Sequence, residues 1–179
     1  MKTKMKFKLT LICALVITIS ISSYAQETPQ LTDPEIASVA VVANQIDIDY
    51  GTVAIKRSNN KEVIDFANTM IKDHNAVIDQ AVALVTKLGV TPKDNAVSQS
   101  LLRQSKETLK KLNSVSKKDF DKTYIDNEVA YHEAVIAAVR DILIPQSKNS
   151  ELKDLLKAVL PALEAHLEHA KMTQSSLLK

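Results

Sequence analysis

Between residues 63 and 88, the residues that would face the interior of a helical bundle are spaced alternately four and three positions apart. This spacing keeps one stripe on a single side of an α-helix and is typical of the seam of a helical bundle. The chain has only two glycines and no tryptophan, and aromatic residues make up 4% of it, which leaves little material for strands and hairpins. The stripe consists of Val63, Ala67, Met70, His74, Val77, Ala81, Leu84 and Leu88.

Capping residues divide the rest of the chain into similar segments. Thr32, followed by Pro34 and Glu35, begins one helix, and Gly89 ends the striped helix as a left-handed cap. Pro161 falls inside the last segment, where it should kink or restart the helix. The sequence predicts helices over 33–58, 60–88, 117–146 and 150–177, and a weaker helix over 94–113 with Leu102, Leu109 and Leu112 inward.

The fold class is therefore all-α. The four long helices form two hairpins with tight turns near 59 and 148, and about 28 residues join the hairpins. Two hairpins joined by one long crossover are the ferritin-like arrangement, here an antiparallel four-helix bundle with a short extra helix in the crossover. The alternative is an up-down bundle with the short helix packed across one end.

The first 25 residues are predicted to be a cleaved signal peptide. Four lysines precede an apolar run over 9–21, and Ser23 and Ala25 are the small residues expected before a cut at Gln26. The run is shorter than the roughly 20 residues that span a bilayer. We expect a periplasmic protein, with association with the outer membrane left open, that has a flexible leader over 26–32 and one domain over 33–179.

Cleavage changes the charge balance of the chain. The whole sequence has 23 basic and 21 acidic residues, and loss of the four lysines leaves 19 basic against 21 acidic. A nearly neutral chain with mixed signs gives no reason to expect a nucleic-acid partner. A Gly-rich phosphate loop, a Gly-x-Ser-x-Gly turn and a His-Glu-x-x-His motif are all missing from the sequence, so nothing in it indicates an enzyme.

Polar residues occupy seam positions near the middle of several predicted helices. If the third long helix runs parallel to the second, the heights of these polar residues along the bundle agree within about one helical turn, ~5 Å. The polar residues should therefore converge. Imidazoles and carboxylates from facing helices are the ligands of a divalent metal in a bundle core. Asp73 and Glu133 are adjacent in sequence to two of the histidines and are expected to orient their imidazoles. The candidate metal residues are His74, His132, His166, Glu128, Asp47 and His169.

Three interpretations of this cluster remain open. It can be a structural hydrogen-bond network, a site for zinc, iron or copper, or a haem-b site that uses Met70 or Met172. The Glu-x-x-His signature of a ferritin-type di-iron site is missing, because Ile71, Val129 and Leu163 stand three residues before the histidines. The sequence favours the structural network over the metal site.

Three short motifs stand in a fixed order along the chain: Ile71-Lys72-Asp73-His74, Phe120-Asp121-Lys122-Thr123-Tyr124, and Leu160-Pro161-Ala162-Leu163-Glu164-Ala165-His166-Leu167. With these motifs the chain resembles the exported bacterial proteins called domain of unknown function 4142, which are often labelled predicted outer-membrane proteins. The resemblance implies a ferritin-like bundle and makes His74, His132 and His166 the family-type histidines, but it implies no established activity.

Two classes of function follow from the sequence. The first is a structural or interaction module of the periplasm or envelope. The second is a metal-binding bundle that serves metal handling or stress defence. The sequence names no partner, and association with the envelope or with a second copy of the chain stays open.

Overall fold

The computed structural model describes residues 29–178, and this part of the chain is helical without a strand. The predicted all-α class is confirmed. The predicted signal peptide and residues 26–28 of the leader lie outside the described residues. The elements are α1 (Asp33–Arg57), α2 (Lys61–Lys87), α3 (Ala96–Ser114), α4 (Lys117–Ala138), the π-helical turn η1 (Val139–Leu143), α5 (Ile144–Gln146) and α6 (Ser150–Ser176).

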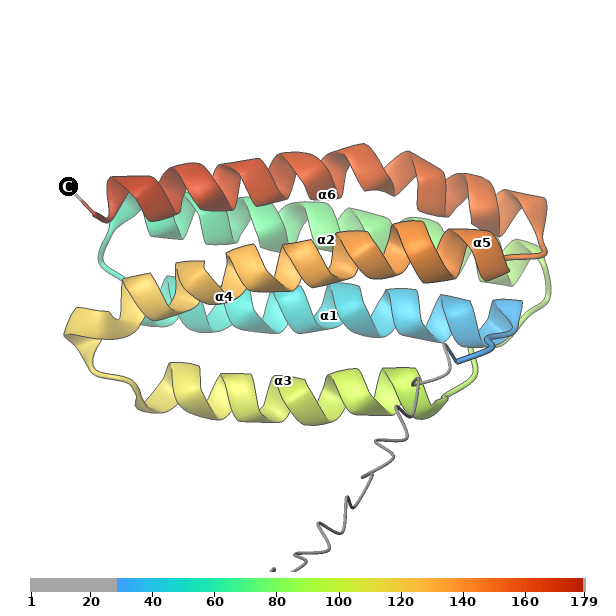
Figure 1. Cartoon of the computed structure of the whole chain (residues 1–179), viewed down its shortest axis with the longest axis horizontal. Helices are drawn as coiled ribbons and strands as arrows, with labels where there is room; N and C mark the ends of the chain where they lie inside the picture. The colour runs from blue at the N-terminus through green and yellow to red at the C-terminus, as the bar shows by residue number, and fades with distance from the viewer. Residues whose placement is uncertain (1–28, 179) are drawn as a thin grey trace, which may run out of the picture.

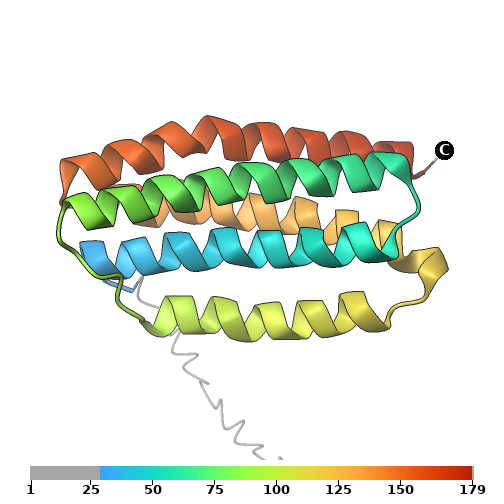
Figure 2. The same cartoon turned by 180° about the vertical axis from the view of Figure 1, so that it is seen from behind.

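The long helices form two antiparallel hairpins, α1–α2 and α4–α6, which pack side by side (Figure 1). The helix α4 runs in the same direction as α2, as the crossover arrangement requires, and the view from behind shows the same order (Figure 2). The crossover helix α3 has 19 residues and lies lengthwise beside α1. The alternative with this helix packed across one end of the bundle is therefore wrong. The bounds of the helix agree with the predicted 94–113 within two residues at each end.

The outer position of α3 also corrects one predicted core residue. Leu102 was expected to point inward but is 36% exposed, whereas Leu112 is fully buried. Because α3 contacts the bundle along one side only, its buried stripe is narrow. That stripe includes two small polar residues, Ser98 and Ser105, beside the apolar ones.

The predicted helix ends agree with the observed caps. The backbone N–H of Thr32 donates to Oε2 of Glu35 over 2.9 Å, which closes the first capping box. Gly89 has a φ of +64°, a left-handed conformation that glycine adopts without strain. The described part of the predicted leader packs on the bundle, since the Leu31 N–H donates to the Gln146 side chain over 2.7 Å.

Two prolines lie within the helical segments and have different effects. Pro145 has no N–H to offer the carbonyl of Asp141, and the π-helical turn η1 precedes it. This turn interrupts the helix predicted over 117–146. The helix α6 continues through Pro161 without a restart, and both views show α6 bowed along its length (Figures 1 and 2).

The apolar core has two halves with a polar layer between them. One half surrounds Phe66 and Tyr124, and the other surrounds Val39 and Leu156. The buried polar residues near the middle of the four long helices are Asp47, His74, Glu128, His132 and His166. In the described part of the chain, every helix is too short or too polar to be a membrane-spanning candidate.

Candidate functional site

The polar layer is built by one or two residues from each long helix. Asp47 comes from α1, His74 from α2, Glu128 and His132 from α4, and His166 from α6. The exposed fractions of these side chains range from 0% for the two carboxylates to 7% for His166. The predicted convergence of the three histidines at one height is observed. Their ring centroids are 5.8 Å (His74–His132), 5.2 Å (His74–His166) and 5.6 Å (His132–His166) apart.

A close contact between α1 and α2 helps to place two of these groups. Gly51 lies one turn after Asp47, and a Cβ on it would come within 3.2 Å of the Ala67 carbonyl oxygen and 3.0 Å of Ile71. A glycine at this position lets the two helices approach closely. Asp47 and His74 therefore reach each other across the interface, with Oδ2 3.3 Å from Nε2.

His169 does not join the cluster that the sequence predicted for it. Its ring packs edge-to-face against Phe66, with ring centroids 5.0 Å apart, in the neighbouring half of the core. Three residues correspond to about 300° around a helix, so His169 points about 60° away from the direction of His166. It belongs to neither group of potential metal-ligating residues found among the described residues.

Each clustered imidazole uses one ring nitrogen in a hydrogen bond to an acceptor. Nδ1 of His74 lies 2.7 Å from Oδ1 of Asn44, whose amide nitrogen donates to the Ala40 carbonyl and so fixes the oxygen as acceptor. Nδ1 of His132 donates to the Glu128 carbonyl over 3.0 Å. Nε2 of His166 lies 3.1 Å from Oδ2 of Asp73. Because all three partners are acceptors, the protons of the neutral rings lie on these nitrogens.

The opposite nitrogens therefore carry lone pairs, and these lone pairs converge. Nε2 of His74, Nε2 of His132 and Nδ1 of His166 are buried without a hydrogen-bond partner among the described residues. One ligand atom from each ring lies within 4.8 Å of the others. Oδ2 of Asp47 lies 3.3 Å and 3.5 Å from two of these nitrogens. A tetrahedral metal with bonds near 2.0–2.1 Å separates its ligands by roughly 3.4 Å. The Asp47 contacts already have this spacing.

The two carboxyl groups are buried at high electrostatic cost. Both oxygens of Asp47 and both of Glu128 are without a hydrogen-bond partner among the described residues. Burial raises the pKa of Asp47 to about 8. Burial, together with the Asp47 charge, raises the pKa of Glu128 well above its usual range. A bound cation would favour the charged forms and remove this cost.

Burial lowers the pKa values of two of the histidines, whereas it raises those of the carboxyl groups. Burial, with the neighbouring His132 and His166, lowers the pKa of His74 to about 3. Burial lowers the pKa of His132 to about 4, and its hydrogen bond to the Glu128 backbone opposes this shift. The rings of His74 and His132 are therefore neutral near pH 7, which is the form that binds metals.

The sequence did not predict one of the residues that orient the imidazoles, and it assigned another to the wrong histidine. Asn44 stands three residues before Asp47, so helical spacing alone could have placed it on the same side of α1. Asp73 was expected to support its neighbour His74, but it orients His166 on the facing helix. Glu133, the other carboxylate considered for such a role, pairs with Lys171 at the surface.

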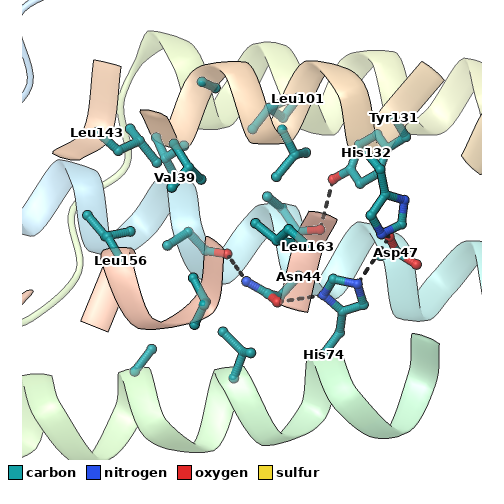
Figure 3. A pocket seen from close by; sticks show the side chains of 18 of the residues that line it. Val39, Asn44, Asp47, His74, Leu101, Tyr131, His132, Leu143, Leu156 and Leu163 are labelled. Atoms are coloured by element: carbon teal, nitrogen blue, oxygen red, sulfur yellow. Dashed lines mark hydrogen bonds and ion pairs between the residues drawn. The ribbon is translucent and has the colours of Figure 1, made fainter. Parts of the chain in front are cut away.

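A cavity of about 630 Å³ opens beside this layer. Figure 3 shows its two ends: His74, His132 and Asp47 lie on one side, and aliphatic residues such as Leu143 and Leu156 lie on the other. The cavity is partly open at its surface, so a ligand can enter it.

The fold and the site together define an all-α bundle with a buried histidine–carboxylate layer. The sequence matches the family described as "Domain of unknown function (DUF4142)" over residues 20–173, and the chain belongs to this family. The predicted family is thereby confirmed. No curated protein matches the chain in sequence.

One solved structure is similar in fold and is titled "CopM in the Cu(II)-bound form". The TM-score is 0.62 with 14% sequence identity, and the match covers 83% of this chain and 99% of that chain. At this identity the likeness shows a shared helical fold.

Proposed function

We propose that this protein binds one divalent transition-metal ion in the mid-bundle layer. His74, His132 and His166 supply three nitrogen ligands, and Asp47 supplies an oxygen. The observation that carries the proposal is the convergence of three buried lone pairs whose tautomers are fixed from outside the site. Hydrogen-bonded partners of this kind orient metal-ligating histidines and raise their basicity.

The donor set favours certain metals. Three imidazoles and one carboxylate suit zinc, copper(II) and iron(II), and binding strength in such a set is greatest for copper(II). The similarity of the fold to a protein whose title names bound Cu(II) supports the inclusion of copper. Glu128 lies beside the set, with Oε2 3.7 Å from Nδ1 of His132, and would balance the charge of the ion.

The location of this function is part of the proposal. The basic residues, apolar run and small residues at the start of the chain predict export to the periplasm. Mass spectrometry of the exported product should give an N-terminus at Gln26. Retention of Met1 in the exported protein would contradict the predicted cleavage.

Titration of the metal-free wild-type protein with zinc(II) and with copper(II) tests the metal proposal. Calorimetry should show one equivalent bound with a dissociation constant below about 1 µM. The affinity should fall on acidification, because protons compete for the same nitrogens. Absence of binding at micromolar concentrations of both metals would reject the proposal.

One observation favours a structural role as the second candidate. With its pKa raised to about 8, a protonated Asp47 can donate to an imidazole nitrogen 3.3 Å away. A buried polar network of this kind fixes the register of the helices. A folded wild-type protein that binds neither metal would support this role.

A further inference from the structure

The aliphatic part of the cavity has no role in metal binding. The proposed ligands occupy one end of it, and the remaining wall is built from side chains of α1, α2, α3, α4, η1 and α6. A metal ion and its ligands would leave this volume unfilled. The volume is therefore available to a second occupant.

The wall indicates the chemistry of that occupant. Away from the histidines the labelled side chains are aliphatic, and Val39, Leu143, Leu156 and Leu163 lie around the space in Figure 3. Apolar walls do not hold ordered water, since each buried water needs two to four polar partners. Asp47 and the histidines stand at one end of the cavity, and the wall as a whole is mainly apolar. The fitting ligand has a long apolar part and one polar end.

The volume is adequate for one small molecule. About 630 Å³ lies within the range of roughly 300–1,000 Å³ found for small-molecule sites. A single alkyl chain matches aliphatic walls along its length, whereas a sugar or a nucleotide would leave its hydroxyl groups without partners there.

We propose that the cavity binds a fatty acid, with its alkyl chain in the aliphatic part and its carboxyl group at the histidine layer. In the metal-free protein a protonated carboxyl group donates to one of the unpartnered imidazole nitrogens. In the metal-loaded protein a carboxylate oxygen takes a further position on the ion. The second contact rests on the proposed metal site, and binding of the chain does not.

Calorimetric titration of the metal-free protein with palmitic, lauric and octanoic acids tests the proposal. One palmitic acid should bind per chain. Shortening the acid should weaken binding by about threefold to fourfold for each CH₂ that leaves the cavity. Equal affinities for the three acids, or no binding of palmitic acid, would overturn the proposal. Because the protein is metal-free, a failure of the metal site does not affect this result.

A pair of variants on α1 locates the binding site. Val39→Phe places extra volume in the cavity and should weaken palmitic acid binding at least tenfold. Val53→Phe makes the same change in the other half of the core, where Val53 does not line the cavity, and should leave binding within about twofold. A far-UV circular dichroism spectrum equal to that of the wild-type protein shows that Val39→Phe is folded. Equal binding by the two variants would contradict the placement of the chain. If neither variant folds, covalent labelling of the cavity wall by a photoreactive fatty acid decides the question, and labelling elsewhere contradicts the proposal.

Discussion

Replacing His132 by alanine should weaken zinc(II) and copper(II) binding by about a hundredfold or more, because loss of a ligand costs more than the 10–100-fold typical of an orienting partner. His132 is the most buried of the three histidines and belongs to both groups of potential metal-ligating residues. Its exposed fraction is 1%, and both Asp47 and Glu128 approach its ring. Titration calorimetry with each metal measures the change.

The chain offers a matched control for this experiment. His169 is a histidine on a long helix near the same layer, but it packs against Phe66. His169→Ala should keep metal affinity within about twofold. Equal losses in the two variants would show that bound metal sits outside the layer. An unchanged affinity in His132→Ala would remove this residue from the ligand set.

The metal-free protein should lose stability between pH 6.5 and pH 8. Asp47 has a pKa of about 8 when folded and an ordinary value of 3.8, so between these values the folded state binds the extra proton. Stability therefore falls as the pH rises through this range. His74 and His132, with pKa values lowered from 6.5 to about 3 and about 4, act in the opposite direction below pH 6.5.

Above pH 6.5 the histidine contribution fades, because the imidazoles of the unfolded chain lose their protons there. The carboxyl effect alone would lower the free energy of unfolding by about 2 kcal/mol over these 1.5 pH units, and the histidines offset roughly half of it, which leaves a loss of about 1 kcal/mol. Urea denaturation at several pH values measures it. The double variant Asp47→Asn, Glu128→Gln should no longer show this loss, and Asp49→Asn on the same helix should retain it. A flat profile in the wild-type protein would contradict the burial of an uncompensated carboxyl group.

Helical spacing was sufficient to predict most of the fold. The stripe over 63–88 and the caps at Thr32, Asn60 and Gly89 gave the helices, since each cap satisfies backbone groups by local contacts. The packing of α3 was harder to predict. Its apolar residues are few, so the choice between Leu101 and Leu102 as the buried residue depends on the neighbouring helix α1.

The candidate site was predictable in composition but not in detail. Equal distances from the turns placed His74, His132 and His166 at one level. The pairing of His166 with Asp73 depends on the rotation of two helices about their axes, which no local pattern fixes. The cavity was not predicted, because an unfilled volume arises from the packing of several helices together.

The four candidate ligands come from both hairpins: Asp47 and His74 belong to α1–α2, and His132 and His166 belong to α4–α6. An ion bound by all four residues would cross-link the two hairpins. The ion could then leave only when the hairpins part. Separation of the hairpins would then limit the rate of metal release. Amide protons at mid-bundle should therefore exchange with solvent at the same rate as a chelator removes the ion.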